Sequence, residues 1–315
     1  MSVKSLSVLL LAGLAAPTLA QSFGDEEDVG IQIAPEREIR FFATGNADFY
    51  STAQSRGRFG GELTSASLDA AITAAIPVDE QTDATLTFSQ TSTGYDFDNF
   101  NDFGGGRTDP IDYGLRVGFS GTIRHSIDPQ WSLFGGANID SSGEIGADIG
   151  DSITFGGFFG IMHHVHEDLS LGLAIGGFSQ LEDDFSFFPI PTIQWQIDDY
   201  WNFVAGATPT NGKPGVEIAY HLNDAWQVGG SATFDFKQFR VKDDNSDLPD
   251  GVFRDWSIPL MFITTWSPEP RFSISGRIGA VVYREVSLRD TNEVGRGSTI
   301  LNPSFGFGVS GEYRF

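Results

Sequence analysis

The sequence predicts an all-β protein, an antiparallel transmembrane up-and-down β-barrel of about 14 strands, with 12 as the alternative count. The first observation is a final segment that alternates apolar and small or polar residues and closes on Tyr313 and Phe315. Successive side chains of a strand point to opposite faces, so this segment has one apolar and one hydrophilic face. The second observation is an alternation of short turns with long Gly- and Asp-rich loops, which is typical of outer-membrane barrels.

The N-terminal region has the features of a secretory signal peptide, which we place at residues 1–20. Lys4 precedes an apolar stretch from Leu6 to Ala16, and small residues lead to a cleavage site after Ala20. We expect an acidic N-terminal segment at 21–37 and the barrel at 38–315. These features predict Sec-type export and a location in the outer membrane of a Gram-negative bacterium.

Composition excludes several classes of protein. The chain has 42 acidic and 19 basic residues and a net charge of −23, which argues against a nucleic-acid partner. It has no Cys, so it can form neither a disulfide framework nor a thiolate metal site.

A recurring sequence pattern marks the predicted turns. It consists of an apolar residue, then Asp or Asn with other polar residues, then an aromatic residue or Leu that begins the next strand. Asp, Asn and Pro favour tight hairpin turns. The short turns are expected at 76–81, 127–131, 165–169, 197–201, 222–226 and 266–272. The long loops are expected at 51–59, 96–111, 140–150, 179–187, 209–214, 241–253 and 287–299. These connections yield fourteen strands with both termini on the short-turn side; short strands near 189–222 would reduce the count to twelve.

Most tryptophans lie close to the short turns. An aromatic girdle at the lipid interface would place them there, whereas the core of a β-sandwich would place them in mid-strand. The predicted girdle is Trp131, Trp195, Trp201, Trp226 and Trp266. Tyr313 and Phe315 are the expected assembly signal at the end of the closing strand.

The hydrophilic faces of the predicted strands carry charges of both signs. The expected lumen-lining residues are Arg40, Asp48, Arg116, Arg124, Glu217, Asp235, Lys237, Arg277, Glu312 and Arg314. If the first and last strands close the barrel, we expect Arg40 to pair with Glu312. Such charges either line a water-filled pore or link to each other and block it.

Candidates for chemistry are few, and we assign no catalytic residue, cofactor site or firm metal site. Weak metal candidates are His164 and His166, spaced to share a strand face, and the loop carboxylates Asp243, Asp244 and Asp247. Interface or lumen histidines and solvated surface charge explain these residues more simply. The run from Gly306 to Gly311 matches the dinucleotide-binding fingerprint, but the chain ends before the helix that this motif needs.

One segment, from Pro189 to Trp201, is more particular than the rest of the chain. With this segment, the hairpin alternation and the final Tyr-Arg-Phe, the chain resembles an uncharacterised family of Gram-negative outer-membrane β-barrels, catalogued as a domain of unknown function. The resemblance implies a location and an architecture, and it implies no catalytic or ligand-binding residues.

The function expected from the sequence is a passive pore or small-solute transporter without cofactor or covalent chemistry. The alternative is a non-conducting structural or surface-interaction barrel, and an outer-membrane enzyme is third. The expected partners are outer-membrane lipid, the barrel assembly machinery and small solutes or cations.

Overall fold

The computed structural model describes residues 38–103, 109–181, 183–242, 250–290 and 295–315. The expected signal peptide at 1–20 and the acidic segment at 21–37 lie outside the described residues and stay predictions. Within the described ranges, no helix has the length and apolar character needed to cross a membrane.

The described chain forms sixteen β-segments. They are β1 (Arg40–Gln54), β2 (Glu62–Pro77), β3 (Thr82–Asp98), β4 (Tyr113–Ser126), β5 (Trp131–Glu144), β6 (Ile153–His166), β7 (Leu169–Gln180), β8 (Asp183–Gln196), β9 (Trp201–Ala207), β10 (Pro214–Asn223), β11 (Trp226–Thr233), β12 (Asp235–Arg240), β13 (Val252–Glu269), β14 (Phe272–Arg289), β15 (Gly295–Ile300) and β16 (Ser304–Arg314).

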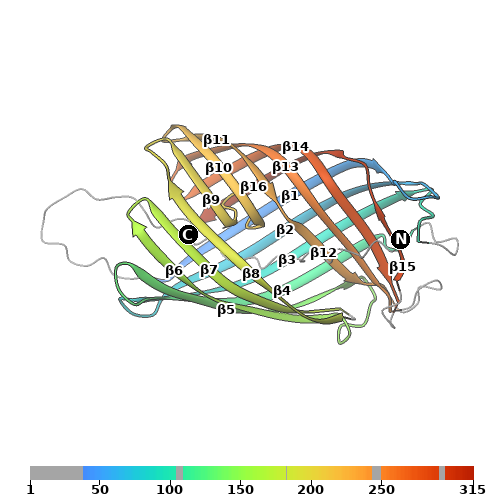
Figure 1. Cartoon of the computed structure of the whole chain (residues 1–315), viewed down its shortest axis with the longest axis horizontal. Coiled ribbons are helices and arrows are strands. Elements are labelled where there is room, and N and C mark those ends of the chain that lie inside the picture. The colour runs from blue at the N-terminus through green and yellow to red at the C-terminus, as the bar shows by residue number, and fades with distance from the viewer. Residues whose placement is uncertain (1–37, 104–108, 182, 243–249, 291–294) are drawn as a thin grey trace, which may run out of the picture.

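These segments make a closed antiparallel barrel of fourteen strands, as the sequence predicts. β11 and β12 are two parts of one strand interrupted at Phe234, and β15 and β16 are two parts of another. β1 pairs with β16, from Phe42 opposite Arg314 to Tyr50 opposite Gly306, and this pairing closes the barrel. Figure 1 shows the tilted strands wrapped around one elongated body, with the short strands β9 and β10 gathered at one end.

The outer surface of the barrel carries an apolar belt. Register places five large apolar residues side by side across β2 to β6: Ile72, Phe88, Phe119, Ile139 and Phe155. Each of these side chains is 51–59% exposed. Water would disfavour so continuous an apolar surface, whereas hydrocarbon tails would stabilise it, so this surface is suited to the interior of a bilayer.

All six predicted short turns are present, and side-chain capping by Asp or Asn explains the sequences of four of them. Asp128 and Asp198 each accept hydrogen bonds through Oδ1 from the backbone N–H groups two and three residues later. Asn223 makes the same two contacts at its turn. At Asp79 the N–H of Gln81 donates to the carboxylate and holds its pKa below the usual range. The recurring Asp or Asn thus satisfies turn donors that have no ladder partner.

One predicted loop is wrong. Residues 179–187 do not form a long connection, because β7 runs to Gln180 and β8 begins at Asp183. The Gly and Asp content around this point suggested a loop. The chain instead pairs Phe178 with Ser186 and places Phe185 and Phe187 exposed on the outer face, so strand pairing with an apolar outer face overrides local turn propensity.

The capping turns provide a test of local stability. Replacing Asp198 by Ala removes the acceptor for two backbone donors and should lower the free energy of unfolding by about 1 kcal/mol. Asp198→Asn keeps an acceptor oxygen, as Asn223 does naturally, and should be nearly neutral. Urea unfolding of the refolded protein in lipid vesicles measures both variants. Equal loss in the two would show that charge matters at this turn more than capping.

Candidate functional site: an occluded lumen

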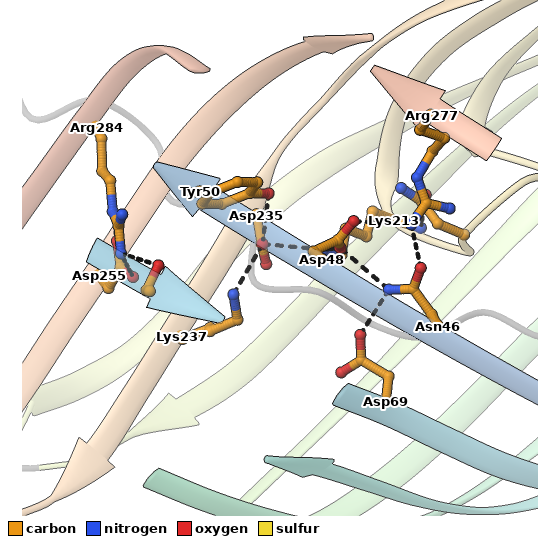
Figure 2. Close-up of polar contacts among 12 residues, drawn as sticks. Asn46, Asp48, Tyr50, Asp69, Lys213, Asp235, Lys237, Asp255, Arg277 and Arg284 are labelled. Atoms are coloured by element: carbon orange, nitrogen blue, oxygen red, sulfur yellow. Dashed lines mark hydrogen bonds and ion pairs between the residues drawn. The ribbon is translucent and has the colours of Figure 1, made fainter. Parts of the chain in front are cut away.

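The lumen contains a buried ionic network centred on Lys213, which lies at the end of the β9–β10 loop (208–213). Its Nζ donates to Asp48 Oδ2 at 3.0 Å and to Asp235 Oδ2 at 2.9 Å. Arg277 Nη2 lies 2.7 Å from Asp48 Oδ1, and Lys237 Nζ lies 3.0 Å from Asp235 Oδ2. Each of the two aspartates therefore contacts two cations. Figure 2 shows these side chains converging from β1, β12, β14 and the β9–β10 loop.

Asn46 extends the network toward β2. Its Nδ2 donates to Asp48 Oδ2 at 3.1 Å and to Asp69 Oδ2 at 2.8 Å, and its Oδ1 accepts from Arg277. Three carboxylates are thus matched by three cations in a set that we call the Lys213 network: Asn46, Asp48, Asp69, Lys213, Asp235, Lys237 and Arg277. Charge balance is necessary here because an unmatched buried charge costs several kcal/mol.

A second ion pair lies farther toward the long-loop end. Arg284 contacts both carboxylate oxygens of Asp255, at 2.9 and 2.8 Å, and donates to Ser65 Oγ at 2.8 Å. Tyr50 joins the pair to the Lys213 network, since its hydroxyl donates to Asp235 at 3.3 Å and the Arg284 guanidinium lies 5.6 Å from the centre of its ring. Charged and aromatic side chains therefore fill successive levels of the lumen (Figure 2).

Beyond the ion pairs, the long-loop end is closed by an apolar cluster. Tyr95 and Phe253 make an edge contact with ring centres 5.0 Å apart, and Phe100 and Phe103 lie 5.1 Å apart. The buried members are Ala53, Leu63, Tyr95, Phe97, Phe100, Phe103, Ile111, Phe239, Val241, Phe253, Val286, Leu288 and Leu301. This cluster joins opposite walls, so the lumen at this end is a packed core.

The ten predicted lumen residues have different surroundings. Asp48, Asp235, Lys237 and Arg277 belong to the Lys213 network. The others are distributed as follows: Arg116 pairs with Asp140 at 2.9 Å, Arg124 contacts His164 at 3.2 Å, Glu217 accepts from Thr210, Glu312 pairs with Arg314 at 2.8 Å, and Arg40 is exposed at the short-turn end.

The expected pair between Arg40 and Glu312 is wrong. The closing register places Glu312 opposite Thr44, four residues beyond Arg40, while Arg40 lies opposite Ala75 of β2. Glu312 instead contacts Arg314 on its own strand. The register between the first and last strands decides this pairing. The apolar–polar alternation of the sequence predicts which face a residue occupies but not this register.

Several residues of the site were not in the predicted lumen set, among them Lys213, Asp255 and Arg284. Lys213 lies in a loop, where the apolar–polar alternation of strands does not predict which way a side chain points. Arg284 was missed because β14 has one extra residue at Val282, opposite the step from Ile258 to Pro259 of β13. A β-bulge of this kind reverses the inward parity, so Arg277 and Arg284 both face the lumen despite their odd spacing.

The weak metal candidates do not meet in one site. A register shift separates His164 from His166, and His164 is engaged by Arg124 and by Ser170 Oγ at 2.7 Å. His166 lies 3.8 Å from Asp168. A neighbouring guanidinium disfavours a bound cation. Asp243, Asp244 and Asp247 lie outside the described residues.

The predicted girdle tryptophans all lie at the short-turn end and are partly exposed, at 36–42%. Trp131 stacks on His163 with ring centres 4.1 Å apart, and Trp226 faces Trp266 at 6.2 Å. Tyr313 and Phe315 are also exposed, and the Phe315 N–H donates to the Phe41 carbonyl across the closing seam.

The glycines of the terminal fingerprint make room for the ionic network. Gly308 lies on the lumen face of β16, and an added Cβ would meet Asp48 Oδ1 and lie 2.7 Å from Arg277 Nη2. A Cβ at Gly306 would lie 2.7 Å from Met261 Cε. These residues therefore serve close packing in a strand, and the strand geometry excludes the dinucleotide reading of the motif.

Comparison with known proteins identifies the family. The family model described as "Domain of unknown function (DUF6268)" matches residues 32–294, and the chain belongs to this family. A search of curated proteins found no significant match.

Solved structures with a similar arrangement include an outer membrane channel from Pseudomonas putida F1, with 9% identity, a TM-score of 0.45 and coverage of 92% of this chain and 100% of that one. Another is the TodX monoaromatic hydrocarbon channel in a deltaS2 mutant form, with 8% identity, a TM-score of 0.49 and coverage of 88% and 90%. A third is the Ralstonia pickettii toluene transporter TbuX, with 11% identity, a TM-score of 0.42 and coverage of 88% and 90%. At these identities the likeness concerns architecture alone.

The close fit at Gly308 predicts a position-specific cost. Gly308→Ala should destabilise the barrel by about 1 to 3 kcal/mol, because the added methyl group displaces the Asp48–Arg277 pair. Gly276→Ala is the matched control on the neighbouring strand, where an added Cβ meets nothing within 4 Å. Urea unfolding in vesicles measures both. Tolerance of Ala at both positions would contradict the proposed packing role.

Proposed function

We propose that this protein is a passive outer-membrane channel for small solutes, which does no covalent chemistry and is closed at its long-loop end in the conformation described above. The observation that carries the proposal is the contrast between the two ends of the lumen. The long-loop end is filled by ion pairs and aromatic rings, whereas the short-turn end has solvent-accessible polar side chains.

The accessible end forms a hydrophilic vestibule inside an apolar wall. Thr44 is exposed on the lumen face, and Thr85, Thr122, Gln227 and Glu312 are partly exposed. The apolar belt on the outside of the same strands suits a bilayer. A barrel with an apolar exterior and a wetted interior is the arrangement that passive diffusion of polar solutes requires.

Lys213 has the position expected of a latch on this route. It belongs to the β9–β10 loop, and its ammonium group bridges the carboxylates of Asp48 on β1 and Asp235 on β12. The remaining contacts of the loop are local: Thr208 bonds to Asn211 and to the Lys213 carbonyl, and Thr210 bonds to Glu217. Release of Lys213 would leave Asp48 with Arg277 and Asp235 with Lys237, so both aspartates would stay neutralised.

The buried carboxylates are better suited to this structural role than to catalysis. Asp48, Asp235 and Asp255 each contact at least one cation, and none is left as a free base beside an open space. We therefore infer transport or passive diffusion in preference to an enzymatic reaction. The outer membrane is the location that fits an exported barrel with this exterior.

The second candidate function is a non-conducting structural or surface-interaction barrel. The same ion pairs favour it, because a lumen permanently closed by arginine–carboxylate pairs would not conduct. Conductance of the latch variant separates the two functions.

Single-channel recording of the refolded protein in planar bilayers tests the latch. Lys213→Met should raise the open probability about tenfold, which corresponds to about 1.4 kcal/mol in the closed-to-open equilibrium. Lys237→Met is the matched control, because it also removes one cation from Asp235 but leaves the β9–β10 loop attached. If the wild type and both variants are silent under all voltages, the structural barrel becomes the better description.

The orientation of the barrel in the membrane can be tested on intact cells, since the chain has no Cys. Ile149→Cys, in the β5–β6 loop, should react with a membrane-impermeant maleimide, because long loops of outer-membrane barrels face the exterior. Asp199→Cys, in the short β8–β9 turn, should react after cell lysis only. Both original side chains are exposed, so burial does not explain a difference. The reverse labelling pattern would invert the proposed topology.

A further inference from the structure

An acidic side chain lies on the outer face of the barrel wall, toward the long-loop end. Asp255 of β13 and Arg284 of β14 face the lumen, and successive residues of a strand point to opposite faces. Trp256 and Glu285 therefore point outward, and the register places them directly opposite each other. Glu285 is thus a carboxylate on the face that elsewhere carries the apolar belt.

Two aromatic donors hold this carboxylate in one orientation. The indole Nε1 of Trp256 donates to Glu285 Oε2 at 3.2 Å, and the hydroxyl of Tyr283 donates to the same oxygen at 2.8 Å. The Trp256 and Tyr283 rings lie with their centres 4.3 Å apart, and Phe234 stacks on Trp256 at 5.3 Å. We call Trp256, Tyr283 and Glu285 the Glu285 site.

The negative charge of the Glu285 site is not matched by a cation. Both donors are neutral and both reach Oε2, and within the described residues Oε1 accepts no hydrogen bond and no basic side chain pairs with Glu285. The side chain is half-buried, so Oε1 can be reached from outside the wall. The lumen carboxylates Asp48 and Asp235, in contrast, each contact two cations. Glu285 therefore presents an open, charged acceptor to a group outside the protein.

The Glu285 site lies at the level of a membrane interface. Trp266 belongs to the girdle at the short-turn end, and Trp256 lies ten residues before it on the same strand, also on the outer face. With a rise of about 3.3 Å per residue and a strand tilt of about 40°, this separation spans about 25 Å along the barrel axis. The apolar band of outer-membrane barrels has about this height. Trp256 and Glu285 therefore lie where the second interface, with its lipid head groups, is expected.

The wall around and below Glu285 is apolar. Ile300 of β15 lies opposite Glu285 in the register and is 37% exposed. Toward the short-turn end the outer face continues with the exposed side chains of Leu260, Ile278 and Val282. A lipid can therefore place its acyl chains on this surface while its head group reaches Glu285.

We propose that the Glu285 site binds a membrane lipid whose head group ends in a primary ammonium group. An N–H of the ammonium group donates to Glu285 Oε1, and the acyl chains lie along the apolar belt. The ammonium group supplies both the missing positive charge and the missing donor. A bare Ca²⁺ ion fits less well, because one carboxylate supplies few of the about six to eight oxygen ligands that it takes. The proposal concerns lipid binding, so it does not depend on whether the barrel conducts.

Native mass spectrometry of the refolded protein tests the preference for a head group. Detergent micelles that contain the wild type are supplied with phosphatidylethanolamine and phosphatidylcholine of identical acyl chains. Both lipids are zwitterionic, but the quaternary nitrogen of phosphatidylcholine has no N–H to donate. We expect the wild type to retain phosphatidylethanolamine about fivefold more than phosphatidylcholine, which is the upper range for one exposed ion pair.

Matched variants assign the preference to Glu285. Glu285→Gln keeps an acceptor oxygen for Trp256 and Tyr283 but removes the charge, and it should abolish the preference. Glu269→Gln removes an exposed carboxylate at the short-turn end of the same hairpin and should leave the preference unchanged. Heat-modifiable migration in electrophoresis reports the folded barrel in every sample. Equal retention of the two lipids by the wild type, or the same preference in Glu285→Gln, would overturn the proposal.

A soluble competitor distinguishes a lipid from a free amine. Glycerophosphoethanolamine has the same head group and no acyl chains, so in excess it should not displace the bound phosphatidylethanolamine. Displacement would show that the site takes a soluble amine and would overturn the assignment to a lipid.

Discussion

Backbone pairing in hydrocarbon is the constraint on which the rest of this structure depends. A strand inside a bilayer has no water for its N–H and C=O groups, so the sheet must close on itself. The β1–β16 seam meets this requirement, and it also sets the stagger that separates Arg40 from Glu312. β8 pairs with β9 only from Ile193 to Gln196, and within the described residues no strand pairs with this edge of β8 from Asp183 to Thr192. Pro189 and Pro191 lie in that stretch, and proline has no N–H that would lack a partner there. Closure and its local exception thus have the same physical cause.

Charge balance is the second constraint, and it operates inside the barrel. Asp48, Asp235 and Asp255 are buried, so each of these carboxylates needs a nearby cation. Asp48 and Arg277 can approach each other beside β16 because Gly308, on the lumen face of that strand, has no side chain and leaves the space that they occupy. Packing and electrostatics are therefore coupled. The ion pairs fill the lumen at the level where Gly308 leaves space, and the apolar cluster fills it nearer the long-loop end.

β12 turns inward from the barrel wall, where Arg240 bridges to Gly143 of β5. One face of β12 contributes Asp235, Lys237 and Phe239 to the packed lumen, while Phe236 and Gln238 on its other face line a cavity of about 40 Å³ beside β5 to β7. This division explains why an occluded barrel still contains a small cavity, whose acceptors Asn138 Oδ1 and Gln238 Oε1 have no hydrogen-bond partner within the described part of the chain.

The sequence by itself predicted the fold class, about fourteen strands with twelve as the alternative, the six short turns and which face of most strands is apolar, because period-two alternation and turn chemistry are local properties. It did not determine the site. The bulge at Val282 reverses parity and turns Arg284 inward, and the β9–β10 loop brings Lys213 to Asp48. The short pairing with β9 leaves one edge of β8 without a described strand partner from Asp183 to Thr192. These outcomes depend on register and on contacts between residues far apart in the chain. Tertiary structure alone decides them, because a one-residue shift reverses which face a side chain occupies.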